Sequence, residues 1–82
     1  MRYDIRYKPR ASKTLRKLPR QTAQRILNAI DRLADDLQGD VKRLTEHEPN
    51  YRLRVGDYRV LFDIEGSAII IYEVWHRQHD YR

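Results

Sequence analysis

Three arginines flank a short turn in the second half of the chain, and their spacing suggests a site for a phosphate group. Arg52 and Arg54 precede the pair Gly56-Asp57, and Arg59 follows it. Glycine at the first position of a two-residue loop is typical of a type II′ hairpin, which would pair Arg54 with Arg59 and leave Arg52 on the same face. Like charges opposite each other destabilise a sheet, so folding alone does not require this arrangement. Guanidinium groups bind phosphate oxygens two at a time, and we therefore predict an anion-binding site, with a merely solvated face as the alternative.

The elements that must hold these arginines follow from the hydrophobic periodicity. Alternating apolar residues predict strands over 3–7, 51–55, 58–64 and 68–75, and apolar residues at steps of three and four predict helices over 10–18 and 23–37. Residues 40–50 are expected to be an irregular connection. The order β-α-α-β-β-β predicts an α+β fold in which an N-terminal strand and a helical hairpin precede an antiparallel β-sheet.

The composition limits the class of protein. The 82 residues suit one domain, expected to span residues 1–82, and no cysteine is present to form a disulfide or bind a metal. Because no apolar run could cross a bilayer and the first residues lack a signal-peptide pattern, we expect a cytoplasmic protein with no membrane partner. His47, His76 and His79 lack a metal-ligand spacing and the glycines are scattered, so neither a metal nor a cofactor is expected.

The charge favours a polyanionic partner. Lysine and arginine number 17 against 12 acidic residues, which gives a formal net charge of +5. Such a balance favours nucleic acid or an acidic protein as the partner. Residues 1–20 are markedly basic, and they contain the side chains that we expect to contact RNA outside the arginine cluster. These are Arg10, Lys13, Arg16, Lys17 and Arg20.

The residues after the last predicted strand carry further groups capable of acid–base chemistry. His76, Arg77, His79 and Tyr81 follow a strand that should neighbour the strand of Arg59. A three-residue loop over 65–67 would place Arg77 on the same face as Arg59, whereas a two-residue loop would not. Both arrangements are compatible with the sequence.

Taken in order, these motifs resemble the RelE/ParE superfamily of bacterial and archaeal toxins, and its RelE-type branch in particular. The similar segments extend over nearly the whole chain: 7–11, 15–19, 51–55, 56–62, His76-Arg77 and Tyr81-Arg82. The resemblance implies the RelE fold, which is similar to that of microbial ribonucleases, and a toxin of a type II toxin–antitoxin system. Members of this branch are ribosome-dependent endoribonucleases that cut mRNA in the ribosomal A site and so inhibit translation.

The resemblance also implies roles for individual side chains in an attack by the RNA's own 2′-hydroxyl on the adjacent phosphorus. The implied catalytic residues are Arg52, Arg54, Arg59, Arg77 and Tyr81. Tyr81 is the expected base, because guanidinium groups lower the pKa of a nearby phenol, and His76 or His79 is a candidate acid. Relatives carry lysines where this chain has Arg52 and Arg54. Arginine keeps its proton, since its pKa lies above about 12, so these two residues can stabilise charge but cannot act as the base.

The partners implied by the resemblance are a RelB-like antitoxin, the 70S ribosome and its mRNA. The basic side chains of residues 10–20 would contact RNA or the ribosome. An acidic, partly disordered antitoxin segment that folds on binding suits a basic surface, and a toxin–antitoxin heterotetramer is one expected assembly.

Two other functions are alternatives at this point. ParE-type toxins share the fold but inhibit DNA gyrase without cutting RNA, and they usually lack the full set of arginines. A non-catalytic RNA-binding module would need exposed aromatic side chains for base stacking, whereas Tyr51, Tyr58, Tyr72 and Trp75 are expected to be mainly structural. The nuclease interpretation requires three guanidinium groups to converge on one exposed side of the hairpin. Arginines that are scattered, or that acidic neighbours hold in internal salt bridges, would end it.

Overall fold

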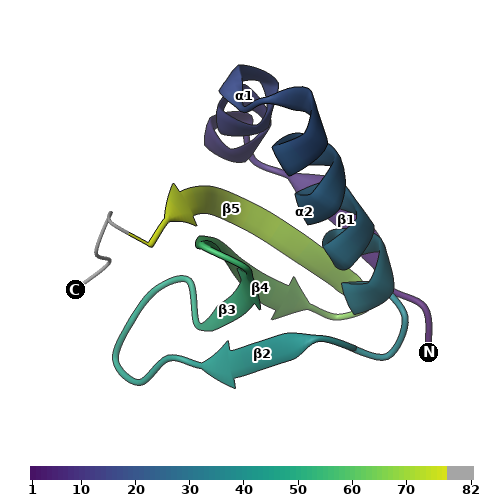
Figure 1. Ribbon diagram of the computed structural model, residues 1–82. Coiled ribbons are helices and arrows are strands. Elements are labelled where there is room, and N and C mark those ends of the chain that lie inside the picture. Colours follow the sequence, from purple (N-terminus) through teal and green to yellow (C-terminus); the bar gives the residue numbers. More distant parts are fainter. Residues whose placement is uncertain (78–82) are drawn as a thin grey trace.

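The computed structural model describes residues 1–77, which form a five-stranded sheet with two helices packed on one face (Figure 1). The elements in chain order are β1 (Asp4–Tyr7), α1 (Pro9–Lys17), α2 (Arg20–Leu33), β2 (Asp40–Arg43), β3 (Tyr51–Val55), β4 (Tyr58–Glu65) and β5 (Ala68–His76). The strand order across the sheet is β1-β5-β4-β3-β2. The predicted α+β fold is confirmed.

Two prolines separate the helices from their surroundings. Pro9 opens α1, where its fixed φ and missing N–H cost nothing, and Pro19 stands between α1 and α2. The buried side of α2 is the predicted apolar stripe, with Ile26, Ile30 and Leu33 almost fully buried. The helix ends at Leu33 rather than near residue 37, because the chain turns away through two positive-φ residues at 36 and 37. No helix within residues 1–77 is long and apolar enough to cross a membrane.

The core lies between the helices and one face of the sheet. Alternate residues of the three long strands point into it, and these are Leu53, Val55, Val60, Phe62, Ile69, Ile71 and Val74. Phe62 is fully buried and stacks on the ring of Tyr51, with 5.4 Å between the ring centroids. Tyr51 and Tyr58 also pack against this core, in line with the structural role expected for them.

The sheet differs from the prediction in two places. β1 pairs in parallel with β5, so the sheet is mixed rather than purely antiparallel. The connection over 40–50 is not wholly irregular, because its first residues form the edge strand β2, antiparallel to β3. Strand β2 has only one apolar residue, Val41, and so lacks the alternation by which a strand is recognised in a sequence.

The second half of that connection covers part of the face of the sheet opposite the helices. Leu61 and Ile70 point to this face yet are buried, and Leu44 of the connection is buried as well. The backbone N–H and side-chain amide of Asn50 donate to the carboxylate of Asp63 on the same face, at 3.2 and 3.0 Å. The uncovered part of this face therefore includes the hairpin end of β3 and β4, where the arginines lie, and the exposed edge strand β1.

Strand β5 contains a bulge that changes which of its side chains face the helices. Phe62 pairs with Ile71, whereas Leu61 pairs with Glu73, so Tyr72 is an extra residue in the ladder. An extra residue shifts the period-two alternation by one position. Beyond Tyr72, odd-numbered residues of β5 therefore point away from the helices.

The core position of Phe62 predicts a large loss of stability on truncation. Phe62→Ala should lower the free energy of unfolding by about 3–5 kcal/mol, because a large cavity forms where the side chain was fully buried. Leu27→Ala is the matched control, since Leu27 is 36% exposed on α2, and it should cost less than about 1 kcal/mol. Urea denaturation followed by circular dichroism measures both, and similar losses for the two variants would contradict this view of the core.

Candidate active site on the outer face of the sheet

The β3–β4 hairpin has the predicted register. Arg54 pairs directly with Arg59, Val55 with Tyr58, and Arg52 with Leu61. Gly56 begins the turn with a φ of +58°, a value that glycine adopts without strain. Leu53, Val55 and Val60 are buried under the helices. The arginines alternate with them along the strands and therefore share the opposite, outer face of the sheet.

Two of these arginines are held by one carboxylate from the edge strand β2. The Nε of Arg54 lies 2.7 Å from one carboxylate oxygen of Asp40. The Nη1 of Arg52 lies 3.5 Å from the other oxygen and donates to the backbone carbonyl of Asp40 at 3.2 Å. The expectation that the three arginines are free of acidic neighbours is thus wrong for Arg52 and Arg54, which share the single negative charge of Asp40.

Arg59 has a different environment. Its Nη1 donates to the backbone carbonyls of Gly56 and Tyr58, at 3.3 and 3.2 Å. Within residues 1–77, no carboxylate lies within ion-pair distance of Arg59. Its positive charge is therefore balanced by no acidic side chain of the described chain, although Arg54, another cation, is its direct neighbour across the strands.

The bulge in β5 brings Trp75 and Arg77 to the arginine face. The loop between β4 and β5 has two residues, Gly66 and Ser67, and on loop length alone Arg77 would point toward the helices. The extra residue at Tyr72 reverses this, so that Trp75 pairs with Arg59. Arg77 then meets Asp57 at the hairpin turn, where its backbone N–H donates to the Asp57 carbonyl at 2.6 Å and its Nε lies 3.8 Å from the carboxylate.

His76 is not brought together with the arginines. It pairs with Tyr58 on the helix side of the sheet, and the two rings meet edge-to-face with 5.1 Å between their centroids. This position lies across the sheet from Arg59, which argues against His76 as the acid. The other two candidates for proton transfer, His79 and Tyr81, lie outside the described residues.

Tyr72 is the nearest described tyrosine in the sequence to that proposed base, but its environment is unsuited to the role. Burial raises the pKa of the Tyr72 phenol, and the negative charges of Glu65, Asp63 and Glu48 raise it further. The ammonium group of Lys8 lies 5.4 Å from the centre of its ring, as in a cation–π contact. A raised pKa disfavours the phenolate at neutral pH, so Tyr72 is a poor general base.

The basic residues predicted in the helical hairpin lie on the two helices. All five are exposed on α1 or at the start of α2, and they are Arg10, Lys13, Arg16, Lys17 and Arg20. Arg10 makes an ion pair of 2.6 Å with Glu73 of β5. The helices cover the side of the sheet opposite the arginine cluster, but Glu73 pairs with Leu61 on the arginine face, so Arg10 reaches the edge of that face through its ion pair.

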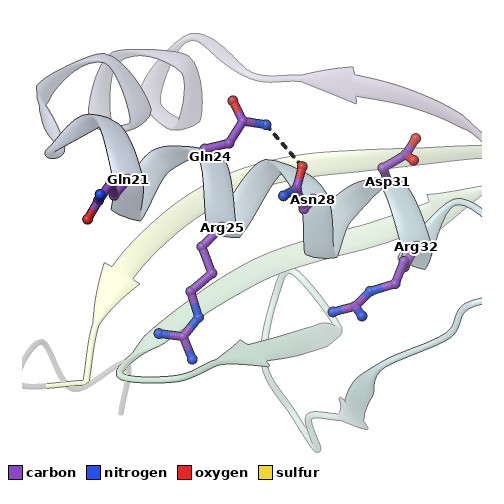
Figure 2. A pocket seen from close by; sticks show the side chains of 6 residues that line it. All are labelled: Gln21, Gln24, Arg25, Asn28, Asp31 and Arg32. Atoms are coloured by element: carbon purple, nitrogen blue, oxygen red, sulfur yellow. Dashed lines mark hydrogen bonds between the residues drawn. The ribbon is translucent and has the colours of Figure 1, made fainter.

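The exposed side of α2 is polar, as Figure 2 shows. The side-chain amide of Gln24 donates to Asn28 at 3.0 Å, and Arg25 and Arg32 extend from the helix toward the sheet. A groove of about 220 Å³ between α2 and β3 is lined by Arg25 and Arg32 from the helix and by Arg54 from the sheet. These helix arginines were not singled out from the sequence, because isolated basic residues on a helix are usually just solvated. Within residues 1–77, no three histidine or acidic side chains are grouped as ligands for a metal.

Comparison with known proteins identifies the family. Residues 5–81 match the family of ParE toxins of type II toxin–antitoxin (parDE) systems. The chain is 32% identical over 74 residues to the toxin RelE3 of Methanocaldococcus jannaschii, a match that includes 84% of each protein. The chain belongs to the RelE/ParE family of type II toxins.

Solved structures of RelE/ParE toxins agree with this assignment. The RelB–RelE antitoxin–toxin complex from Methanococcus jannaschii contains a chain with a TM-score of 0.73 and 27% identity, which covers 89% of this chain and 91% of that one. The toxin–antitoxin complex RelBE2 from Mycobacterium tuberculosis gives a TM-score of 0.79 and 27% identity, covering 94% of this chain and 100% of that one. The five-stranded mixed sheet with its helical hairpin is therefore the fold of RelE structures.

Within this RelE/ParE toxin, the sequence alone missed two residues on the arginine face. Asp40 is missed because its strand has no recognisable pattern, although an acid opposite Arg54 could have been sought once β2 was known. Trp75 was expected to be structural, but it is half-buried beside Arg59 and is not a member of the core cluster. The face thus combines cations with one aromatic ring.

Trp75 is the only tryptophan of the chain, so the tryptophan fluorescence reports on the electrostatic potential at the arginine face. Iodide should quench the fluorescence more strongly than caesium, because Arg59 pairs with Trp75 and attracts anions. The preference for iodide should shrink in Arg59→Ala and persist in Arg6→Ala, which removes the same charge from the far strand β1. Neutral acrylamide controls for accessibility, and equal quenching by the two ions in the unmodified protein would contradict a cationic face.

Proposed function

We propose that this toxin is a metal-independent endoribonuclease that acts on mRNA in the A site of the ribosome. The observation that carries the proposal is the direct pairing of Arg54 with Arg59 on the outer face, a repulsive arrangement with no benefit for folding. A phosphate bound between two guanidinium groups turns that repulsion into attraction. The positions of these residues within the sequence motifs shared with RelE toxins support the same role.

The proposed reaction needs no nucleophile from the protein. The 2′-oxygen of the RNA forms a bond to the adjacent phosphorus, and the bond from phosphorus to the 5′-oxygen of the next nucleotide breaks. The 2′-hydroxyl proton passes to a base, for which Tyr81 remains the candidate, and the leaving 5′-oxygen takes up a proton, for which His79 remains the candidate. The products are a 2′,3′-cyclic phosphate and a 5′-hydroxyl end.

The arginines supply the stabilisation of charge. Negative charge grows on the non-bridging phosphate oxygens as the phosphorus becomes five-coordinate, and preorganised cationic donors are worth most at that point. Arg59 is held by two backbone carbonyls and Arg54 by Asp40, so both are oriented before RNA binds. Arg77 stands at the edge of the same face, beside Asp57, and would contact the phosphate or its neighbour.

The proposed partners follow from the relatives. The two solved relatives are complexes of a toxin with a RelB-type antitoxin, and we propose that this chain is neutralised by an acidic antitoxin of that kind, in a heterotetramer. The ribosome would contact the basic surface of α1, on the helix side of the molecule. Such a toxin acts where ribosomes are, in the cytoplasm.

Gyrase inhibition is the second candidate function, because the matching family is that of ParE toxins. The two functions predict different lesions in the cell. A nuclease stops translation and leaves cuts at fixed positions within codons, whereas a gyrase inhibitor causes DNA damage and stops replication first.

Brief induction followed by primer extension on a chosen mRNA tests the proposal. The unmodified toxin should produce cuts in codon phase, and Arg59→Ala should reduce cleavage by about 100-fold or more, the usual cost of removing one preorganised donor. Arg6→Ala is the matched control, since it removes an exposed arginine from β1 and should leave the cuts unchanged. Full cleavage by a folded Arg59→Ala variant, or DNA damage without mRNA cuts, would overturn the nuclease proposal.

A pair of tyrosine variants tests the base. Tyr81→Phe should lower single-turnover cleavage on isolated ribosomes by about 10²- to 10⁴-fold, the usual contribution of general base catalysis. Tyr72→Phe should leave the rate within about twofold, since the raised pKa of Tyr72 keeps its phenol protonated. The assignment of Tyr81 fails if its phenylalanine variant cleaves normally.

A further inference from the structure

The strongest unassigned feature of the molecule is the carboxylate of Asp40, which flanks the arginine cluster on the edge strand β2. Each of its two oxygens faces a different guanidinium group, with Arg54 Nε at 2.7 Å and Arg52 Nη1 at 3.5 Å. Its backbone carbonyl accepts a further hydrogen bond from Arg52 at 3.2 Å. A negative charge placed inside a phosphate-binding face opposes phosphate binding, so its presence needs a physical reason.

The two arginines that Asp40 contacts differ sharply in exposure. The side chain of Arg52 is only 12% exposed, whereas that of Arg54 is 55% exposed. Arg52 therefore exposes little of its side chain to a ligand, and its Nη1 already contacts Asp40. Arg54, by contrast, is bound through Nε, and most of its surface remains open to a phosphate.

The position of Asp40 also determines on which side Arg54 lies. Arg54 is the central residue of a row across three strands, with Asp40 paired on one side and Arg59 on the other. Repulsion from Arg59 and attraction to Asp40 act in the same direction, toward β2. Without the carboxylate, an exposed and flexible arginine would sample many rotamers away from its positively charged neighbour.

We propose that Asp40 is a positioning residue, which holds the Arg54 guanidinium in the orientation that the bound phosphate requires, with Arg52 as its partially buried support. This inference rests on the proposed nuclease function. The arrangement gives up affinity for RNA, because the carboxylate repels phosphate, and gains a fixed donor for the transition state. Asp40 therefore raises the rate of cleavage while it weakens the binding of RNA.

Opposite effects on rate and affinity distinguish this role from two simpler ones. If Asp40 only supported the fold, its loss would lower both the cleavage rate and the affinity for RNA. If it only competed with the phosphate, its loss would raise both. A positioning residue alone predicts that the two quantities move in opposite directions.

The experiment compares Asp40→Asn with the unmodified toxin in single-turnover cleavage on mRNA-programmed ribosomes and in binding of a short single-stranded RNA. Asp40→Asn should bind RNA about threefold more tightly at low salt, in line with the small worth of one surface charge. Its cleavage rate at saturating toxin should fall by about 10- to 100-fold, the usual cost of a displaced catalytic group. Asp40→Glu, which keeps the charge, should recover more of the rate than Asp40→Asn does.

Two controls make the result specific. Glu65→Gln removes one negative charge from the exposed turn at the other end of β4, so it should tighten RNA binding no more than Asp40→Asn and leave the rate unchanged. In an Arg54→Ala background, Asp40→Asn should have no further effect on the rate, because the carboxylate acts through Arg54. A rate that still falls tenfold in that background overturns the proposal, as does a parallel change of rate and affinity.

A spectroscopic measurement separates this inference from the function on which it rests. The Nε–H proton of Arg54 should exchange slowly with water in the unmodified protein and at least tenfold faster in Asp40→Asn. If the unmodified toxin cuts no RNA, the nuclease proposal fails, and the exchange and binding measurements still decide whether Asp40 orders Arg54. Equal exchange in the two proteins overturns the positioning role, whatever the activity.

Discussion

Alternation along the β3–β4 hairpin couples the core of this protein to its arginine cluster. Leu53, Val55 and Val60 must point toward the helices, because that burial stabilises the domain. Because side chains alternate between the two faces of a strand, Arg52, Arg54 and Arg59 must then point away from the helices. Burial of the apolar face therefore fixes the register of the hairpin and offsets the repulsion between Arg54 and Arg59. A functional surface that is unfavourable by itself is maintained by packing on the opposite side of the same strands.

The parts of the structure that local pattern controls were predictable from the sequence. The register of the hairpin follows from the Gly56-Asp57 turn, and the helical stripe of α2 follows from its period. The face occupied by Arg77 was not predictable, because it depends on a bulge at Tyr72 that the residue types there do not indicate. Strand β2 was missed for a related reason. It is an edge strand that pairs with β3 alone, so its own sequence needs little strand character.

The charged neighbours of the arginine cluster could not be predicted from the local sequence pattern either. Asp40 reaches Arg52 and Arg54 only because an unpredicted strand runs beside β3. Conversely, His76 is separated from the arginines by the thickness of the sheet although it adjoins Arg77 in the sequence. Nearness in sequence and nearness in space diverge most where side chains alternate between two faces. A site assembled on a sheet is therefore best inferred strand by strand, with each bulge counted.

The order of the strands in the sheet has a consequence for how the molecule can fold during its own synthesis. Strand β5 lies between β1 and β4, and it pairs with the first strand of the chain in parallel. A nascent polypeptide that has emerged only as far as β4 lacks the strand that joins β1 to β4 in the complete sheet. The middle of the sheet closes when β5 pairs with both of these strands and places Trp75 beside Arg59. The completed cationic face thus comes into existence only after nearly all of the described chain has been made.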